Sequence, residues 1–182
     1  KVAHIGHPIR QNLIQKSKEG SDTYFKIDPN IPTILIIGGS QGAQTINDTF
    51  VDILPEIIKT YQVLHQTGEL LYKETVDRVS VVLNESEFKN RYHAFADLST
   101  SDLKYAAGAA TLVISRAGSM IFEIANWGIP SIIIPIRPEI SRDQTSNAFS
   151  YARTGAAIVI EENNLTSSIL LHEIKHLMEN KT

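Results

Sequence analysis

Short apolar runs rich in β-branched residues alternate along the chain with longer stretches whose apolar residues recur every three or four positions. Runs of the first kind are typical of strands buried on both faces, and stretches of the second kind of helices that bury one face. The pattern predicts strands at residues 34–37, 61–65, 91–95, 111–114, 131–134 and 156–160. It predicts helices at residues 43–52, 56–58, 69–79, 99–107, 120–127, 143–153 and 165–178, the second being a restart after Pro55.

Strands that alternate with helices predict a parallel sheet joined by right-handed crossovers. We therefore expect an α/β fold, a Rossmann-like parallel six-stranded sheet with helices on both faces, in one domain over residues 33–182. Residues 1–32 are expected to be a lead-in, with a short strand at 2–5 and a turn at 28–32. In sheets of this kind, ligands bind at the carboxyl ends of the strands, where the strand order reverses.

Composition narrows the classes of function. The 182 residues are 42% apolar and carry a net charge of −3, so the sequence offers no basic face for nucleic acid. No cysteine is present, which removes disulfides, thiolate metal ligands and cysteine nucleophiles, and agrees with a cytoplasmic location. The most apolar stretch, residues 106–136, contains Arg116, Glu123 and prolines and is no membrane span. Because the chain opens with Lys1 and no signal peptide, we expect a fragment of a longer protein.

The first candidate site follows the strand at 34–37, where Gly38, Gly39 and Gly42 precede a helix. Unpaired amides and the helix dipole at such a turn favour an anion, most often a phosphate. A dinucleotide fingerprint would require a glycine where Ser40 stands, and an acidic residue where the second strand ends in His65 and a glutamine, so NAD is disfavoured. No Gly-Lys-Ser/Thr follows, which excludes a P-loop.

Two further turns precede helices in the second half of the chain. Residues 115–119 lead into a helix that contains Glu123, which could hold the two hydroxyls of a ribose. Taken alone, a helix-dipole carboxylate that contacts only water is the favoured reading of Glu123. Gln144 and Asn147 share a face of a later helix, and such amides suit sugar hydroxyls, although taken alone a polar first turn on a surface helix is the favoured reading.

The sequence does not favour a catalytic metal. It contains no Asp-x-Asp pair, and its six histidines lack the spacing of zinc sites. His172 and His176 are four residues apart without a third ligand and are expected to be surface residues. His65 ends a core strand on the ligand side, where a structural histidine and a ligand contact are equally expected. The spacing around Ser40 and Ser119 also excludes a serine-hydrolase elbow.

Taken together, these segments resemble the C-terminal half of the MurG family of glycosyltransferases. The resemblance rests on segments in the family's order along the chain: residues 38–43 with Asn47, 65–68, 115–118 with Glu123, 128–130 and 143–148. It begins at residues 4–10, which are similar to the family's interdomain segment, and reaches nearly to residue 182. Family members transfer N-acetylglucosamine from UDP-GlcNAc to lipid I, making lipid II in peptidoglycan synthesis.

The resemblance implies one half of a GT-B enzyme, the half that binds the sugar-nucleotide donor. Ser40 and its neighbours, together with the backbone of residues 118–121, would hold the diphosphate, and Glu123 would hold the ribose. Phe95 and Ala96 would bind uracil through main-chain groups, and Gln144 would bind the sugar, while the role of Arg116 stays open. The substrate-binding residues expected on this basis are Gly39, Ser40, Gln41, Gly42, Phe95, Ala96, Arg116, Gly118, Ser119, Met120, Ile121, Glu123, Gln144 and Asn147.

The implied reaction is an inverting transfer without a metal or other cofactor, in which UDP is the leaving group. The general base, the lipid I site and the contact with the cytoplasmic face of the membrane would belong to an N-terminal domain absent from this chain. The fragment itself is expected to be soluble and inactive alone. The alternatives left open are a non-catalytic subunit of a split GT-B enzyme, an NAD-binding domain and a UDP-GlcNAc epimerase.

Overall fold

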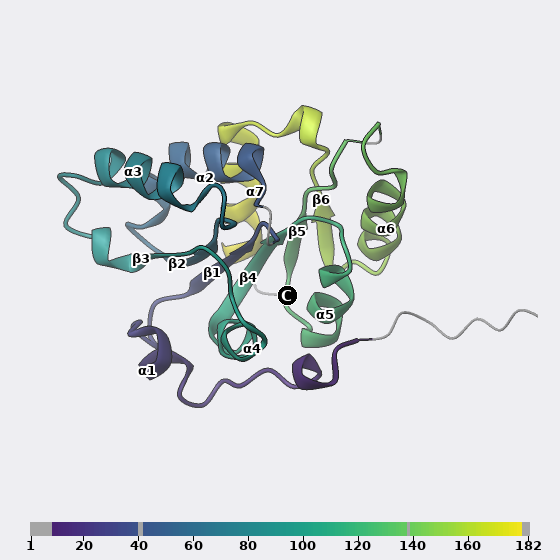
Figure 1. Ribbon diagram of the computed structural model, residues 1–182, viewed down its shortest axis with the longest axis horizontal. Helices are drawn as coiled ribbons and strands as arrows, with labels where there is room; N and C mark the ends of the chain where they lie inside the picture. The colour runs from purple at the N-terminus through teal and green to yellow at the C-terminus, as the bar shows by residue number, and fades with distance from the viewer. Residues whose placement is uncertain (1–8, 40–41, 138, 180–182) are drawn as a thin grey trace, which may run out of the picture.

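The computed structural model describes residues 9–39, 42–137 and 139–179, and within that part of the chain the side chain of residue 142 is not described. Its centre is a six-stranded, wholly parallel sheet in the order β3-β2-β1-β4-β5-β6 (Figure 1). The strands are β1 (Thr33–Ile37), β2 (Gln62–Gln66), β3 (Tyr92–Phe95), β4 (Ala110–Ser115), β5 (Ser131–Ile133) and β6 (Ala157–Val159). Each lies within one residue of its predicted bounds, which confirms the predicted strands.

Helices cover both faces of this sheet (Figure 1). One face carries α2 (Gln44–Ile57), α3 (Tyr72–Val82) and α7 (Ser167–Glu179). The other carries α1 (Ser21–Phe25), α4 (Thr100–Ala109), α5 (Met120–Trp127) and α6 (Arg142–Ala152). Three short 3₁₀ helices complete the described elements: η1 (Gln11–Leu13), η2 (Lys89–Arg91) and η3 (Glu162–Asn164).

The sheet divides the core into two apolar clusters because successive side chains of a strand point to opposite faces. In β1, Ile34 and Ile36 pack with α2 and α7, whereas Leu35 and Ile37 pack with α4 and α5. All four side chains are buried, as the uninterrupted apolar run predicts for a strand covered on both faces.

Helix α2 differs from the prediction. It runs unbroken to Ile57 with Pro55 inside it, so the predicted restart at residue 56 is wrong. Proline removes one amide donor and leaves the carbonyl of Val51 without its helical partner. Pro55 lies in the last turn and is exposed, and the helix closes normally beyond it because the Ile58 amide donates to the Leu54 carbonyl at 3.0 Å.

The predicted start of the fourth helix is confirmed in detail. The Ser99 hydroxyl accepts from the Asp102 amide at 3.2 Å, and the Asp102 carboxylate accepts from the Ser99 amide at 2.8 Å. This reciprocal pair satisfies two donors that the first turn of a helix leaves free. It fixes where α4 begins, beside the carboxyl end of β3.

The described part of the lead-in packs closely against the domain. The Trp127 indole donates to the Leu13 carbonyl at 2.7 Å, and the Ser17 amide donates to the Lys104 carbonyl at 3.0 Å. The chain passes so near α4 that a Cβ on Gly108 would overlap the Ser17 carbonyl oxygen. The strand predicted at residues 2–5 lies outside the described residues.

Candidate functional site

A cavity of about 660 Å³ opens at the carboxyl edge of the sheet. It lies where the strand order reverses, because β1 is followed in sequence by β2 on one side while β4 pairs with it on the other. The loops that leave β1 and β4 both contribute to its wall. This is the position at which sheets of this topology bind ligands.

The first loop connects β1 to α2. Gly39 and Gly42 have φ angles of 82° and 79°, a region that side chains disfavour, and the Gly42 amide donates to the Gly39 carbonyl at 2.9 Å. A Cβ on Gly42 would overlap the Thr67 carbonyl oxygen behind the loop. Gly38, Gly39 and Gly42 all line the cavity, as predicted for an anion-binding turn. Ser40 and Gln41, predicted to contact the diphosphate, lie outside the described residues.

A buried hydrogen-bond network supports this first loop from behind. The Asn47 amide group donates to the Thr67 carbonyl at 2.9 Å, and its oxygen is 3.1 Å from Nε2 of His65. Nδ1 of His65 is 2.9 Å from the Tyr92 hydroxyl. Since the Asn47 oxygen only accepts, Nε2 carries a proton, and in the neutral imidazole Nδ1 then accepts from the tyrosine hydroxyl.

Burial disfavours the imidazolium and lowers the pKa of His65 to about 3. His65 is fully buried and does not line the cavity, so of its two equal readings the structural one is correct. Asn47, one of the residues that carry the family resemblance, makes two hydrogen bonds of this network, to the Thr67 carbonyl and to His65.

The second loop connects β4 to α5 and is more open. Gly118, Ser119 and Met120 line the cavity, and a Cβ on Gly118 would meet no atom within 4 Å. The Ile121 amide donates to the Gly118 carbonyl at 3.2 Å, and its side chain is buried in the core. The Ile121 amide thus closes the first turn of α5, and the ligand contacts predicted for the backbone of residues 118–121 remain predictions.

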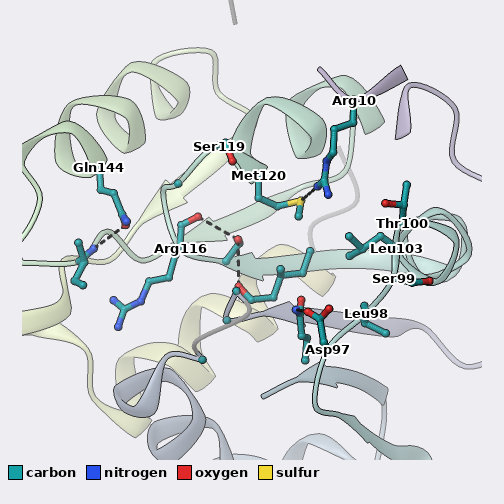
Figure 2. Close-up of a pocket in the computed structure, with 18 residues that line it drawn as sticks. Arg10, Asp97, Leu98, Ser99, Thr100, Leu103, Arg116, Ser119, Met120 and Gln144 are labelled. Carbon is teal, nitrogen blue, oxygen red and sulfur yellow. Dashed lines mark hydrogen bonds between the residues drawn. The ribbon is translucent and has the colours of Figure 1, made fainter. Parts of the chain in front are cut away.

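Glu123 lies beneath the second loop and is only 4% exposed. Its Oε1 accepts from Nε of Arg10 at 2.9 Å, whereas its Oε2 is buried without a hydrogen-bond partner among the described residues. The reading of Glu123 as a carboxylate that contacts only water is thus wrong. Arg10 itself is exposed, reaches from the lead-in to the cavity wall beside Met120, and was not predicted (Figure 2).

Arg116 follows β4 and lines the cavity, but its guanidinium is bound by other groups of the protein. Nη2 lies 2.5 Å from Oε1 of Glu162, and Nη1 donates to the Ile134 carbonyl at 3.4 Å. Figure 2 shows the side chain pointing away from Arg10 and Met120. In this structure Arg116 joins the second loop to the loops after β5 and β6.

The two amide side chains of α6 that are predicted to bind substrate line different pockets. Gln144 lines the cavity, and its oxygen accepts from the Ile136 amide at 3.2 Å, which leaves its nitrogen as a donor (Figure 2). Asn147 does not line this cavity; it lines a smaller groove between α5 and α6 with Phe122 and Tyr151. The two amides therefore line different pockets, because Asn147 lies about one turn further along the axis of α6 than Gln144.

The opposite wall comes from the segment between β3 and α4 (Figure 2). Asp97, Leu98, Ser99 and Thr100 line the cavity there. Phe95 packs into the core, and its carbonyl accepts from the Thr67 amide at 2.9 Å, so that carbonyl is engaged already. Ala96 is half-buried beside the lining residues.

Gln66 also lines the cavity, and it is not among the predicted substrate-binding residues. Its amide nitrogen donates to Oδ1 of Asp97 at 2.5 Å, and its oxygen is buried without a partner among the described residues. Gln66 is the last residue of β2 and Asp97 lies two residues beyond β3, both at the edge where ligands bind. That position could have marked both residues as candidates.

Within the described ranges, no three histidine or acidic side chains come together as a metal site. His172 and His176 are exposed on α7, as expected of surface residues. No helix in the described part of the chain is both long and apolar enough to cross a bilayer. The cavity wall combines glycine backbone, hydroxyls, amide side chains, Asp97 and two arginines with apolar side chains, namely Ile37, Leu98, Leu103, Met120 and Ile136, and Glu123 lies beneath it.

Comparison with known proteins shows which family the chain matches. A model described as "Glycosyltransferase family 28 C-terminal domain" matches residues 33–182. A "UDP-N-acetylglucosamine--N-acetylmuramyl-(pentapeptide) pyrophosphoryl-undecaprenol N-acetylglucosamine transferase" from Clostridium perfringens is 35% identical over 178 residues, which cover 97% of this chain and 47% of that protein. The protein of the same name from Alkaliphilus oremlandii is 31% identical over 182 residues, covering 99% of this chain and 48% of its own length.

The crystal structure of MurG from Acinetobacter baumannii has the same fold. It matches with a TM-score of 0.73 at 23% sequence identity, over 94% of this chain and 49% of that one. This likeness confirms the predicted fold, a Rossmann-like half of a GT-B architecture. The chain spans about half the length of the curated relatives it matches.

Proposed function

Since the chain belongs to the glycosyltransferase family 28 C-terminal domain family, we propose that it is the donor-binding half of a UDP-GlcNAc-dependent glycosyltransferase. The whole enzyme would add N-acetylglucosamine to lipid I to make lipid II in peptidoglycan synthesis. The names of the relatives from Clostridium perfringens and Alkaliphilus oremlandii support this substrate pair. The proposal covers this chain as the half that holds the sugar nucleotide.

One observation carries the proposal: two strand–turn–helix loops face a single cavity where the strand order reverses. The loop after β1 contributes Gly38, Gly39 and Gly42, and the loop after β4 contributes Gly118 and Ser119. Two sets of backbone amides at helix starts suit the two phosphates of a nucleoside diphosphate. The cavity, at about 660 Å³, is within the range that binds a ligand of this size.

The remaining groups suit the rest of a UDP-sugar. Glu123 lies beneath the second loop and is not part of the cavity wall; one of its oxygens is held by Arg10, and the other, which has no partner among the described residues, would accept from a ribose hydroxyl. Gln144 presents its amide nitrogen, which can donate to a sugar hydroxyl. The segment from Phe95 to Asp97 lies by the opposite wall, where main-chain groups of Phe95 and Ala96 would bind uracil. Ser40, Gln41 and Arg116 complete the proposed set, with Arg116 acting through the loop.

The chemistry proposed is an inverting displacement. An acceptor hydroxyl attacks the anomeric carbon, the bond from that carbon to the diphosphate oxygen breaks, and its electron pair leaves with UDP. The amides of the two loops stabilise the negative charge where it develops, without reorganisation and without a metal or other cofactor. The general base, the lipid I site and the attachment to the cytoplasmic face of the membrane are assigned to the half of the relatives that this chain does not span.

Calorimetric titration of the 182-residue chain with UDP-GlcNAc, UDP and NADH, each with and without EDTA, tests this function. We expect saturable binding of both uridine nucleotides that EDTA does not change, and no heat with NADH. Binding of NADH alone, or of none of the three, would refute the proposal.

A Glu123→Gln variant tests the ribose contact. Because a hydrogen bond to a charged group contributes about 1.5–3 kcal/mol, we expect UDP affinity to fall by about tenfold or more. Glu87→Gln, at an exposed position away from the cavity, is the control and should bind like the wild type. Thermal melts of both variants show whether the fold is kept, and equal UDP affinity of the two would remove Glu123 from the site.

A further inference from the structure

Three loops at the carboxyl edge of the sheet meet at one carboxylate, that of Glu162. Arg116 comes from the loop after β4, Arg137 from the loop after β5, and Glu162 from η3 after β6. Oε1 of Glu162 lies 2.5 Å from Nη2 of Arg116, and Oε2 lies 3.3 Å from Nε of Arg137. The predicted site does not include Glu162 or Arg137.

This ion-pair cluster is largely removed from water. The Glu162 side chain is 8% exposed and that of Arg116 15%, whereas Arg137 is 57% exposed. Burial raises the pKa of Glu162, but the hydrogen bond and charge of Arg116 outweigh it, and the pKa is lowered below its ordinary value. The carboxylate is therefore ionised at neutral pH. A buried charge pair of this kind holds its geometry strictly, because either partner left alone is costly.

Glu162 also reaches the helix that follows the first loop. The Thr45 side chain, in the first turn of α2, lies close enough to the Glu162 carboxylate to help lower its pKa. Glu162 therefore contacts Arg116, the residue before the second glycine turn, and lies near the start of the helix that follows the first. Glycines of both turns line the cavity.

We propose that Glu162 is a positioning residue for the diphosphate subsite, which sets the spacing between the loop after β1 and the loop after β4. It draws the Arg116 guanidinium back against the Ile134 carbonyl, so that the backbone of residues 116–120, rather than the arginine head, faces the cavity. The inference rests on the proposed function, because it assigns the two loops to the two phosphates of a bound UDP.

Positioning and simple electrostatics predict opposite results when the charge of Glu162 is removed. A carboxylate near a bound diphosphate repels it, so if charge alone mattered, Glu162→Gln would strengthen UDP binding. If Glu162 acts through geometry, the same change releases Arg116 and the second loop, and UDP binding weakens. The sign of the change therefore separates the two effects.

The experiment compares UDP and UMP binding to the wild-type chain, Glu162→Gln and Glu161→Gln by calorimetry. Glu161 is the adjacent, exposed carboxylate and serves as the matched control. For Glu162→Gln we expect UDP affinity to fall about tenfold and UMP affinity at most about threefold, because preorganised amides contribute most where both phosphates bind. Glu161→Gln should match the wild type with both ligands. A general loss of fold would lower both affinities equally.

A Glu162→Gln variant that binds UDP as well as Glu161→Gln, or more tightly, overturns the inference while leaving the proposed function intact. If the wild-type chain binds no UDP, the proposed function fails and this inference fails with it. If Glu162→Gln does not fold, Thr45→Val and Arg137→Gln replace it, since both positions are exposed. Each should lower UDP affinity about threefold with a smaller change for UMP, and no change in either variant would also overturn the inference.

Discussion

The two glycine loops of the cavity arise from the same strand–turn–helix pattern but are built in different ways. The loop after β1 is fused to the core: Gly42 touches the Thr67 carbonyl, and Asn47 binds the same carbonyl from the following helix. The loop after β4 has open space beside Gly118 and is held at its edge by the Arg116–Glu162 ion pair.

This difference separates two tasks that the sequence pattern does not distinguish. A loop packed against buried backbone keeps its shape whether or not a ligand is present, so changes in it should first lower the stability of the domain. A loop whose glycine faces only the cavity can change without disturbing the core, so changes in it should first lower affinity. We expect substitutions to follow this division, from the largest effect to the smallest.

Replacing Gly42 by alanine should give the largest effect. The new Cβ would overlap the Thr67 carbonyl oxygen, and the alanine backbone would have to keep a φ of 79°, which L-residues disfavour. We expect the free energy of unfolding to fall by about 3 kcal/mol or more, measured by urea denaturation. Gly39→Ala is the control, because φ is 82° there but a Cβ would meet nothing within 4 Å; its cost should be about 1 kcal/mol. Equal losses for the two variants would contradict the close contact.

Lowering the pH should reduce the free energy of unfolding through His65, which belongs to the network behind the same loop. His65 has a pKa of about 3 in the folded chain and about 6.5 when unfolded, so only the unfolded chain takes up its proton as pH falls below 6.5. Stability from this group is complete above pH 6.5 and declines towards pH 3, by about 2 kcal/mol between pH 6.5 and pH 5. Denaturation of His65→Gln over the same range should show a shallower decline, and an unchanged slope would show that His65 titrates normally in the folded chain.

Alanine at Gly118 is the same chemical change as in Gly42→Ala, made in the other loop. Its Cβ would enter open space, so we expect stability to stay within about 0.5 kcal/mol of the wild type. The methyl group would stand where a phosphate approaches the amides, and UDP affinity should fall about tenfold by calorimetry. A marked loss of stability with normal affinity would reverse the proposed division between the two loops.

The strands and the two loops could be predicted because each is specified locally. The run Ile34 to Ile37 suits a strand covered on both faces, and the glycines after it suit a turn, whatever the rest of the chain does. The position of the cavity follows from the topology, because carboxyl ends of parallel strands share one edge. The capping of α4 by Ser99 and Asp102 is equally local.

The contacts that complete the site depend on separations along the chain that no local pattern encodes. Arg10 reaches Glu123 across 113 residues, and Arg116 reaches Glu162 across 46. Asn147 lies one turn further along α6 than Gln144 and lines the groove between α5 and α6 instead of the cavity, a difference that their spacing of three residues does not reveal. The predicted substrate contacts remain predictions that the titrations above test.

The close passage of the lead-in under α4 and α5 bears on how the chain can be shortened. A protein cut to residues 33–182, the extent of the family match, would expose the apolar surface that Leu13 and Phe25 now cover. The Trp127 indole would lose its acceptor, and Glu123 would keep a buried charge without the guanidinium of Arg10 to balance it. Any expression of the domain alone should therefore retain the segment from residue 9 onward, even though the family match begins only at Thr33.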